Sequence, residues 1–262
     1  MTIVIQNIKT IDDVIEALGQ IIIECEKSND TTGYFASLYQ KVTIKVKEGI
    51  LNNYFDDGAR MEKLDVIFAK RYIEAFAEWR NGEPVTESWR RAFGASANYW
   101  PVVFQHLMLG MNAHISLDLG IAAAEVSDGK DIPALQGDFN RINEILSALV
   151  HEVQDDLARI WPTLKWLLRQ SGKADDFMVD FSMKLARNGA WKFATRCAAC
   201  SADELEQLIA ERDVKVARKS ALVTRPGLVA TVIFAVIRLG ERGTVAEKIG
   251  HLKSVVETED QA

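Results

Sequence analysis

The chain has 262 residues, of which 48% are hydrophobic and 26% are charged, and its formal net charge is −6. These are the proportions of an ordinary globular protein. Lys and Arg are scattered and form no run interleaved with aromatic residues. The electrostatic footprint of a nucleic-acid-binding protein is therefore missing, and we expect no nucleic-acid partner.

The cysteines and the most apolar segment bear on the compartment. Cys25, Cys197 and Cys200 are too few for a disulfide framework. The last two form an isolated C-x-x-C at the end of a helical pattern, without the context of a redox or zinc motif, so we expect them to pack as small apolar residues. Residues 1–9 do not resemble a signal peptide, and 228–239 is shorter than the roughly 20 residues of a membrane span. We expect 228–239 to be a buried helix, with no membrane span, in a cytoplasmic protein.

Apolar residues recur at helical spacing almost everywhere, and alternation with period two is nearly absent, which predicts an all-α fold. In chain order we expect helices over about 10–27, 31–52, 57–81, from 87, 101–126, 138–161, from Asp175 or Asp176, from 201 and from 244. The longest polar break is 127–137. The predicted architecture is a single domain over 1–262, with roughly eight to ten helices around one long central helix and with frayed ends at 1–9 and 257–262.

The central helix, expected from Pro101 to about Val126, carries two of the four histidines. At about 100° per residue, His106, His114 and Asp118 fall in one sector among apolar neighbours. Gly110 lies between the histidines and leaves bare backbone, which would admit either a ligand or another helix. Other polar residues of this helix lie on a second strip, which indicates a helix contacted on several sides: Gln105, Asn112 and Ser116.

The spacing of these polar residues limits their chemistry. His114 and Asp118, at i and i+4, can hydrogen-bond each other or share a divalent metal ion. His106 lies about 12 Å along the axis from His114, so its role would be substrate contact or proton transfer. The structural alternative is a buried His–Asp hydrogen bond that orients the imidazole and holds the helices in register. Both alternatives stay open, and a divalent metal is one option for a cofactor that is otherwise unknown.

Asp65 falls in the middle of the apolar stripe of the helix expected over 57–81. An unpaired carboxylate on a core face is costly, so Asp65 must find a cation, a metal or hydrogen-bond donors. Arg71 and Arg60 are the nearest structural partners. In the functional alternative, Asp65 faces the histidine sector as a ligand or general base, and Tyr72 beside it donates a hydrogen bond.

The run from Tyr99 to Gly120, with the pattern His-x-x-Leu-Gly-Met-Asn-Ala-His-Ile-x-x-Asp-Leu, resembles an uncharacterised helical family, the domain-of-unknown-function family five-nine-nine-five. Two further parts of the chain look like its pattern: Asp65-Val-x-Phe-Ala-x-Arg71-Tyr72 and Asp138-Phe-x-x-Ile-Asn143. The resemblance covers about 33–191. It implies a shared helical fold and carries no established activity.

His114-x-x-x-Asp118 is also similar to a fragment of the metal-binding helices in the zinc-dependent phospholipase C and nuclease family, which is all-helical. That family needs many more His and Asp ligands, whereas this chain has four histidines. The departure argues against a trinuclear zinc site.

From these patterns we expect an enzyme that acts on a small, mostly apolar metabolite by acid–base or metal-assisted chemistry in a buried polar pocket. The expected catalytic residues are His106, His114, Asp118 and Asp65, and the expected ligand contacts are Asn112, Tyr72, Gly110 and Arg71. His114 and Asp118 would be the metal ligands. The alternative is a non-catalytic binder of an apolar ligand or of a helical partner protein, in which the same residues form a structural network.

Overall fold

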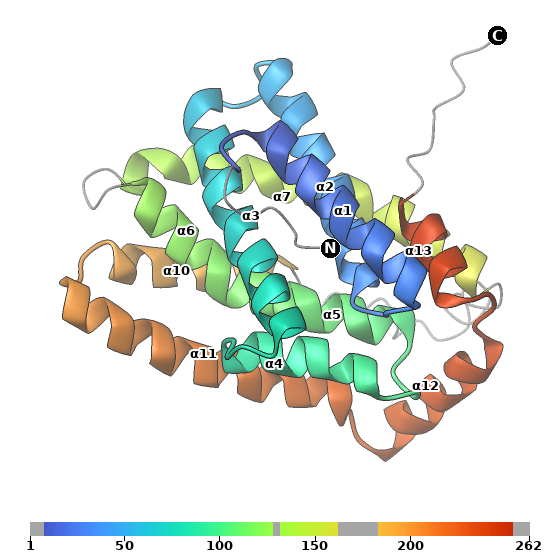
Figure 1. Ribbon diagram of the computed structural model, residues 1–262. Coiled ribbons are helices and arrows are strands. Elements are labelled where there is room, and N and C mark those ends of the chain that lie inside the picture. Colours follow the sequence, from blue (N-terminus) through green and yellow to red (C-terminus); the bar gives the residue numbers. More distant parts are fainter. Residues whose placement is uncertain (1–7, 128–131, 162–182, 254–262) are drawn as a thin grey trace, which may run out of the picture.

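The computed structural model describes residues 8–127, 132–161 and 183–253 (Figure 1). Every regular element in these ranges is a helix, which confirms the predicted all-α class. The eleven α-helices, close to the number expected, are α1 (Ile11–Ser28), α2 (Gly33–Leu51), α3 (Gly58–Asn81), α4 (Glu87–Gly94), α5 (Val103–Ala113), α6 (Leu119–Val126), α7 (Ile132–Ile160), α10 (Met183–Cys197), α11 (Ala202–Thr224), α12 (Leu228–Gly240) and α13 (Val245–Lys253). A short 3₁₀ turn, Ala95–Ala97, follows α4, and a π turn, His114–Asp118, joins α5 to α6.

Several helix ends lie where the sequence places capping residues. The Thr10 hydroxyl accepts a hydrogen bond from the backbone N–H of Asp13, whose carboxylate accepts one from Thr10 in return. The carboxylate of Asp57 caps α3 by accepting a single hydrogen bond from the backbone N–H of Arg60. The helix ends at Gly82, whose φ of 74° glycine adopts at little cost. The capping pairs predicted at the starts of α11 and α13 also form: Ser201 with Glu204, and Thr244 with Glu247.

The α7 helix begins six residues earlier than the start predicted at Asp138. Pro133 occupies its first turn, where a missing N–H costs nothing, and Gly137 lies inside the helix. The carboxylate of Asp138 instead accepts hydrogen bonds, each 2.8 Å long, from the backbone of Asp56 and Asp57. The predicted helix start was wrong because Asp138 caps a distant turn. The helix start expected at Asp175 or Asp176 lies outside the described residues.

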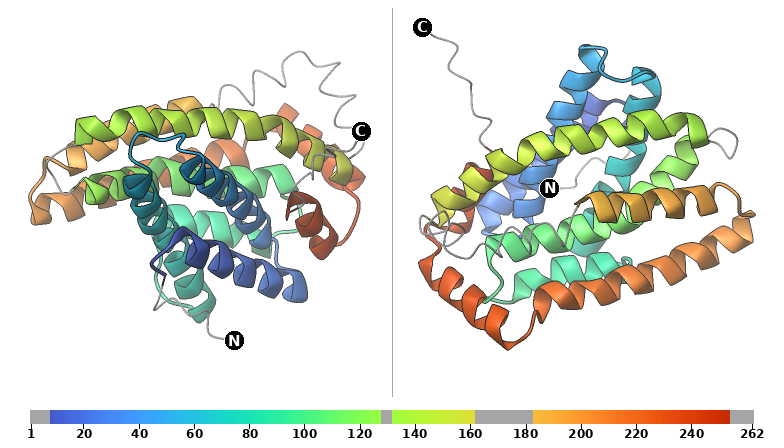
Figure 2. Two further views of the ribbon diagram at one scale, coloured as in Figure 1. Left: turned by 90° about the horizontal axis from the view of Figure 1, so that it is seen from above. Right: turned by 180° about the vertical axis from the view of Figure 1, so that it is seen from behind.

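The path from Val103 to Val126 is the centre of the molecule, as predicted. Figure 2 shows this path surrounded by other helices, and α2, α3, α4, α10 and α11 all contact it. By length and composition alone the path could cross a membrane, but 94% of its most apolar window is buried inside the structure. The core helix of a folded protein passes the same test.

The α12 helix is not the buried helix that its composition predicted. None of its residues is buried, and Leu228 and Leu239 are 83% and 74% exposed. The helix turns away from α11 at an angle of 69° and lies at the edge of the bundle (Figure 1). Its described contacts are few, among them Gly240 against the Trp161 indole. A run of apolar residues therefore does not by itself place a helix in the core.

The three cysteines are free thiols in the structure. Cys25 and Cys197 are buried and Cys200 is half-buried. Cys197 is the last residue of α10, so the C-x-x-C ends a helix as predicted. Its first cysteine packs in a small apolar cluster rather than in a redox site.

Candidate buried acid–base site

The central helix changes its hydrogen-bonding pattern over the five residues His114–Asp118, which form a π-helix. Such turns are rare in proteins overall, but where they occur they are often at functional sites. Each of its residues advances by less than the 100° assumed for an α-helix, so side chains beyond it are rotated relative to those before it. All five residues of the turn are buried.

Asp118 is the anchor of the site. Its Oδ1 accepts a hydrogen bond from Nε of Arg71 at 2.9 Å, and its Oδ2 accepts one from Nε1 of Trp89, also at 2.9 Å. Nδ1 of His114 lies 3.2 Å from the same Oδ2. Burial alone would raise the pKa of Asp118, but the contacts with His114, Arg71 and Trp89 outweigh it and hold the pKa below its usual value. Asp118 is therefore a buried carboxylate that stays charged.

His114 is a buried neutral base. Burial lowers the pKa of its imidazole, and the neighbouring Asp118 only partly opposes this shift. Because charged Asp118 can only accept hydrogen bonds, the neutral ring must carry its proton on Nδ1. Nε2 then holds a lone pair, and this atom has no hydrogen-bond partner among the described residues.

Aromatic rings enclose the imidazole of His114. Phe68 is stacked on it, with 3.6 Å between centroids and 6° between planes, and Tyr39 meets it edge-on at 4.5 Å. Three further rings lie 5.8 to 6.0 Å away: Phe35, Trp89 and Tyr72. These rings come from α2, α3 and α4, so the site is assembled by the packing of three helices on the central one. They give it an apolar lining and exclude water.

Asp65 lies on the same face of α3 as Phe68 and Tyr72, as predicted, and it is buried. Burial, and then the charge of Glu62, raises its pKa to about 7. The expected pairing with Arg71 is wrong, because the Arg71 guanidinium binds Asp118. The other expected partner, Arg60, bonds to Ser127. Oδ2 of Asp65 has no hydrogen-bond partner among the described residues.

Three buried polar atoms near Tyr39 have no hydrogen-bond partner among the described residues: Nε2 of His114, Oδ2 of Asp65 and the Tyr39 hydroxyl itself. Tyr39 connects them, since its pKa is raised first by burial and then by the charges of Asp65 and Asp118. The Tyr72 hydroxyl also lacks a partner there, but the charges that act on it are those of Cys25 and Asp30. Each unpaired buried group costs about 1–3 kcal/mol, and folded proteins keep few of them. Their gathering at one place therefore needs an explanation beyond packing.

His106 is not part of this cluster, although it was expected in the same sector as His114. Its ring packs edge-on against Tyr34, with 5.7 Å between centroids. Burial, and then the charge of Arg238, lowers its pKa to about 4. His106 is a neutral core histidine near the other end of the central helix.

The other polar positions of the central helix hold neighbouring helices. A Cβ at Gly110 would lie 2.4 Å from Cγ of Phe35, so the bare backbone admits a side chain of α2. On the second polar strip, the Asn112 amide donates to the carbonyl of Val216, and that of Gln105 to the carbonyl of Val223. The strip therefore binds α11, in agreement with a helix contacted on several sides.

Of the two predicted relationships between His114 and Asp118, the structure contains the hydrogen bond. Within 8–127, 132–161 and 183–253, no group of three or more His, Cys, Asp or Glu side chains is arranged to hold a metal ion. Both oxygens of Asp118 also receive hydrogen bonds from Arg71 and Trp89. The shared metal stays a prediction without a third ligand in the described ranges.

Sequence reasoning missed three residues of the site: Trp89, Tyr39 and Phe68. Trp89 lies on α4 and has no spacing relationship with Asp118, so nothing along the chain connects the two. Phe68 and Tyr39 read as ordinary members of apolar stripes. Only the crossing of α2 and α3 over the π turn brings these rings to His114.

The fold and site define an all-helical protein with a buried His–Asp pair on a π turn of its central helix. A family model described as "Family of unknown function (DUF5995)" matches residues 11–226, so the chain belongs to this family. The match is longer than the region 33–191 expected from the motifs. Comparison with the curated proteins and with the solved structures finds no match.

Proposed function

We propose that the protein is an enzyme that transfers a proton to or from a small, mostly apolar molecule bound at the aromatic cluster around His114. One observation carries the proposal: Nε2 of a neutral, buried His114 and Oδ2 of Asp65 both lack a hydrogen-bond partner among the described residues, and Tyr39 lies close to both. Residues with strongly shifted pKa values that gather at one place are typical of functional sites.

The roles follow from the hydrogen bonds and charges. His114 acts as the general base through Nε2, and Asp118 fixes the ring and stabilises the imidazolium that forms. Asp65, whose pKa is raised to about 7, exchanges its proton easily near neutral pH. The hydroxyl of Tyr39, which lies near both Asp65 and Asp118, donates a hydrogen bond to the polar group of the substrate.

The lining sets the class of substrate. Five aromatic side chains surround the imidazole, so most of the bound molecule must be apolar. The unpaired donors and acceptors require at least one polar group on it, such as a carbonyl or hydroxyl. The Arg71 side chain, 28% exposed, reaches from the buried Asp118 to the surface.

A second candidate is a non-catalytic protein, in which the His–Asp pair is a structural network and the core binds an apolar ligand or a helical partner. The close stacking of Phe68 on His114 favours this candidate, because the imidazole is packed like a core side chain. The two candidates differ in one consequence. Only the enzyme loses its chemistry when Nε2 is removed without loss of the fold.

The test is a turnover screen. Wild-type protein and His114→Asn are incubated with a fractionated small-molecule extract, and each reaction is followed by untargeted mass spectrometry. The matched control is His106→Asn, which removes a buried histidine from the same helix outside the cluster. We expect a compound that wild type and His106→Asn consume and that folded His114→Asn does not. Equal consumption by all three would reject His114 as the base.

A further inference from the structure

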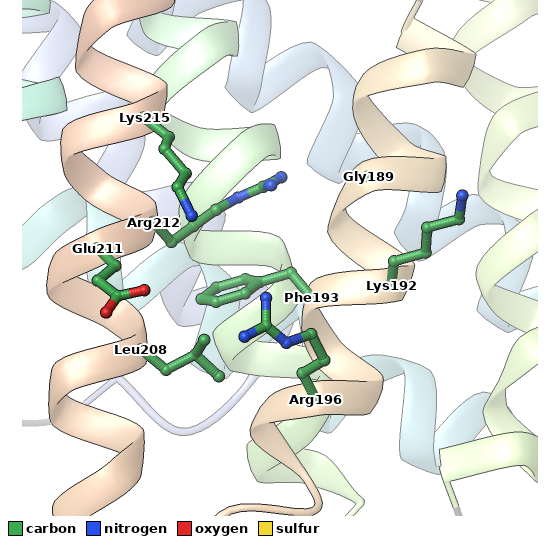
Figure 3. Close-up of a pocket in the computed structure, with 8 residues that line it drawn as sticks. All are labelled: Gly189, Lys192, Phe193, Arg196, Leu208, Glu211, Arg212 and Lys215. Atoms are coloured by element: carbon green, nitrogen blue, oxygen red, sulfur yellow. The ribbon is translucent and has the colours of Figure 1, made fainter.

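A groove with a volume of about 160 Å³ lies between α10 and α11 (Figure 3), and none of its lining residues belongs to the aromatic cluster. The side chains of Phe193 and Leu208 form its apolar wall. In Figure 3 the side chains of Arg196, Arg212 and Lys215, which are all cationic, lie near the Phe193 ring. The chain as a whole is acidic, with a net charge of −6, so this concentration of positive charge is a local feature.

Arg212 is held in place before any ligand binds. Its Nε donates a hydrogen bond of 2.9 Å to the carbonyl oxygen of Ser116, and its guanidinium carbon lies 5.1 Å from the centre of the Phe193 ring. Gly189 leaves room for the guanidinium, since a Cβ there would come to 3.4 Å from Nη2. With Nε occupied, the two Nη groups keep donors for a ligand, and little entropy is lost when they bind one.

The positive charge of the groove is not neutralised by neighbouring carboxylates. Among the described residues, Arg196 and Lys215 form no ion pair or hydrogen bond, and both are exposed. Glu211 is the one carboxylate in the lining, and it accepts a long hydrogen bond from Gln207. The pKa of Arg212 is lowered, first by burial and in part by the charge of Arg196. An anion in the groove would remove this repulsion.

We propose that this groove binds a small molecule that carries a phosphate group, with the phosphate at Arg196, Arg212 and Lys215 and its apolar part against Phe193 and Leu208. A dianionic phosphate matches several cations better than a single carboxylate does, and the guanidinium fork fits its oxygens. The proposal does not rest on the proposed proton transfer at His114, because the groove uses different side chains, although Arg212 is hydrogen-bonded to the backbone of the π turn that carries His114.

The probes are phenyl phosphate, inorganic phosphate and benzoate, each titrated into the full chain by calorimetry at constant ionic strength. We expect phenyl phosphate to bind more tightly than inorganic phosphate, because only the former contacts the apolar wall. Benzoate, with one charge, should bind more weakly than phenyl phosphate. Arg196→Ala and Lys215→Ala each remove a charge-assisted hydrogen bond and should weaken phenyl phosphate binding about tenfold.

Arg218→Ala is the matched control, since Arg218 is an exposed cation on the same helix that does not line the groove. It should leave the affinity unchanged. Weakening by Arg218→Ala as large as that by Arg196→Ala would show non-specific attraction and overturn the proposal. The absence of saturable binding of phenyl phosphate to wild type would overturn it as well, as would tighter binding of benzoate.

Discussion

The imidazole of His114 lies parallel to the ring of Phe68, with 3.6 Å between their centroids. The stacking fixes the plane of the imidazole, and the hydrogen bond from Nδ1 to Asp118 fixes how the ring is turned within that plane. The direction of Nε2 is therefore set by α3 and by the π turn. In the proposed proton transfer, a ring held in this way would need no reorientation when it takes a proton.

Asp65→Asn should change how stability depends on pH. The pKa of Asp65 is about 7 in the folded chain and about 3.9 when unfolded, so the folded state binds the proton more tightly. Its contribution is fully present below about pH 4 and is lost as the pH rises to about 7, a change of up to ~4 kcal/mol. The variant should lack this fall and be more stable than wild type at pH 8 by ~2 kcal/mol.

Denaturant titrations of wild type and Asp65→Asn at pH 4 to 8 measure this effect. The control is Asp203→Asn, which removes an exposed carboxylate in the first turn of α11 and should keep the wild-type slope. A variant less stable than wild type at pH 8 would mean that Asp65 has a stabilising partner, in contradiction to the unpaired Oδ2.

His106→Gln should also change how stability depends on pH, but in the opposite direction to Asp65→Asn. The pKa of His106 is about 4 when folded and about 6.5 when unfolded, so its contribution is present above about pH 6.5 and is lost as the pH falls to about 4. The loss amounts to ~3 kcal/mol in wild type. Acid unfolding followed by circular dichroism measures it. An unchanged acid limb in the variant would contradict the burial of a neutral His106.

Gly110→Ala should destabilise the fold by about 1–3 kcal/mol, because the new Cβ would lie 2.4 Å from the Phe35 ring. Gly250→Ala is the matched control: it lies inside α13 with nothing within 4 Å of a Cβ, and should stabilise by up to ~1 kcal/mol. Thermal unfolding compares the two. Equal effects at both glycines would mean that Phe35 does not fill the space at Gly110.

Much of the fold follows from local rules. The caps at Thr10, Asp57, Ser201 and Thr244 were found because each lies within three residues of its partner. The start of α7 was missed because Asp138 caps a turn whose residues, Asp56 and Asp57, lie 82 and 81 positions away in the sequence. The exposure of α12 was missed because composition does not say where a helix lies in the bundle.

Only the part of the candidate site that depends on contacts close in sequence was predicted. His114 and Asp118 were paired correctly, since i and i+4 contacts are local. The grouping with His106 failed because both histidines are buried but against different helices, and which helices cross at each position is not a local property of the sequence. Trp89 was missed because its contact with Asp118 is made across helices.

Asp118→Asn should destabilise the fold by ~3 kcal/mol or more, because an amide cannot accept from Arg71, Trp89 and His114 at once. Trp89→Phe removes one of these donors and part of a fully buried ring, and should cost ~2 kcal/mol. Denaturant unfolding at pH 7 gives both values. A cost for Asp118→Asn no larger than that for Trp89→Phe would contradict the anchoring role of Asp118.

The most direct measurement of the central claim is the protonation of His114, read from long-range ¹⁵N–¹H spectra of its imidazole at pH 7, with His114→Gln to assign the signals. The account predicts a neutral ring with its proton on Nδ1, and an Nε2 shift typical of an unprotonated nitrogen. A proton on Nε2, whether in the other neutral tautomer or in an imidazolium, would contradict it, because Nε2 would then have no lone pair with which to accept a proton from a substrate.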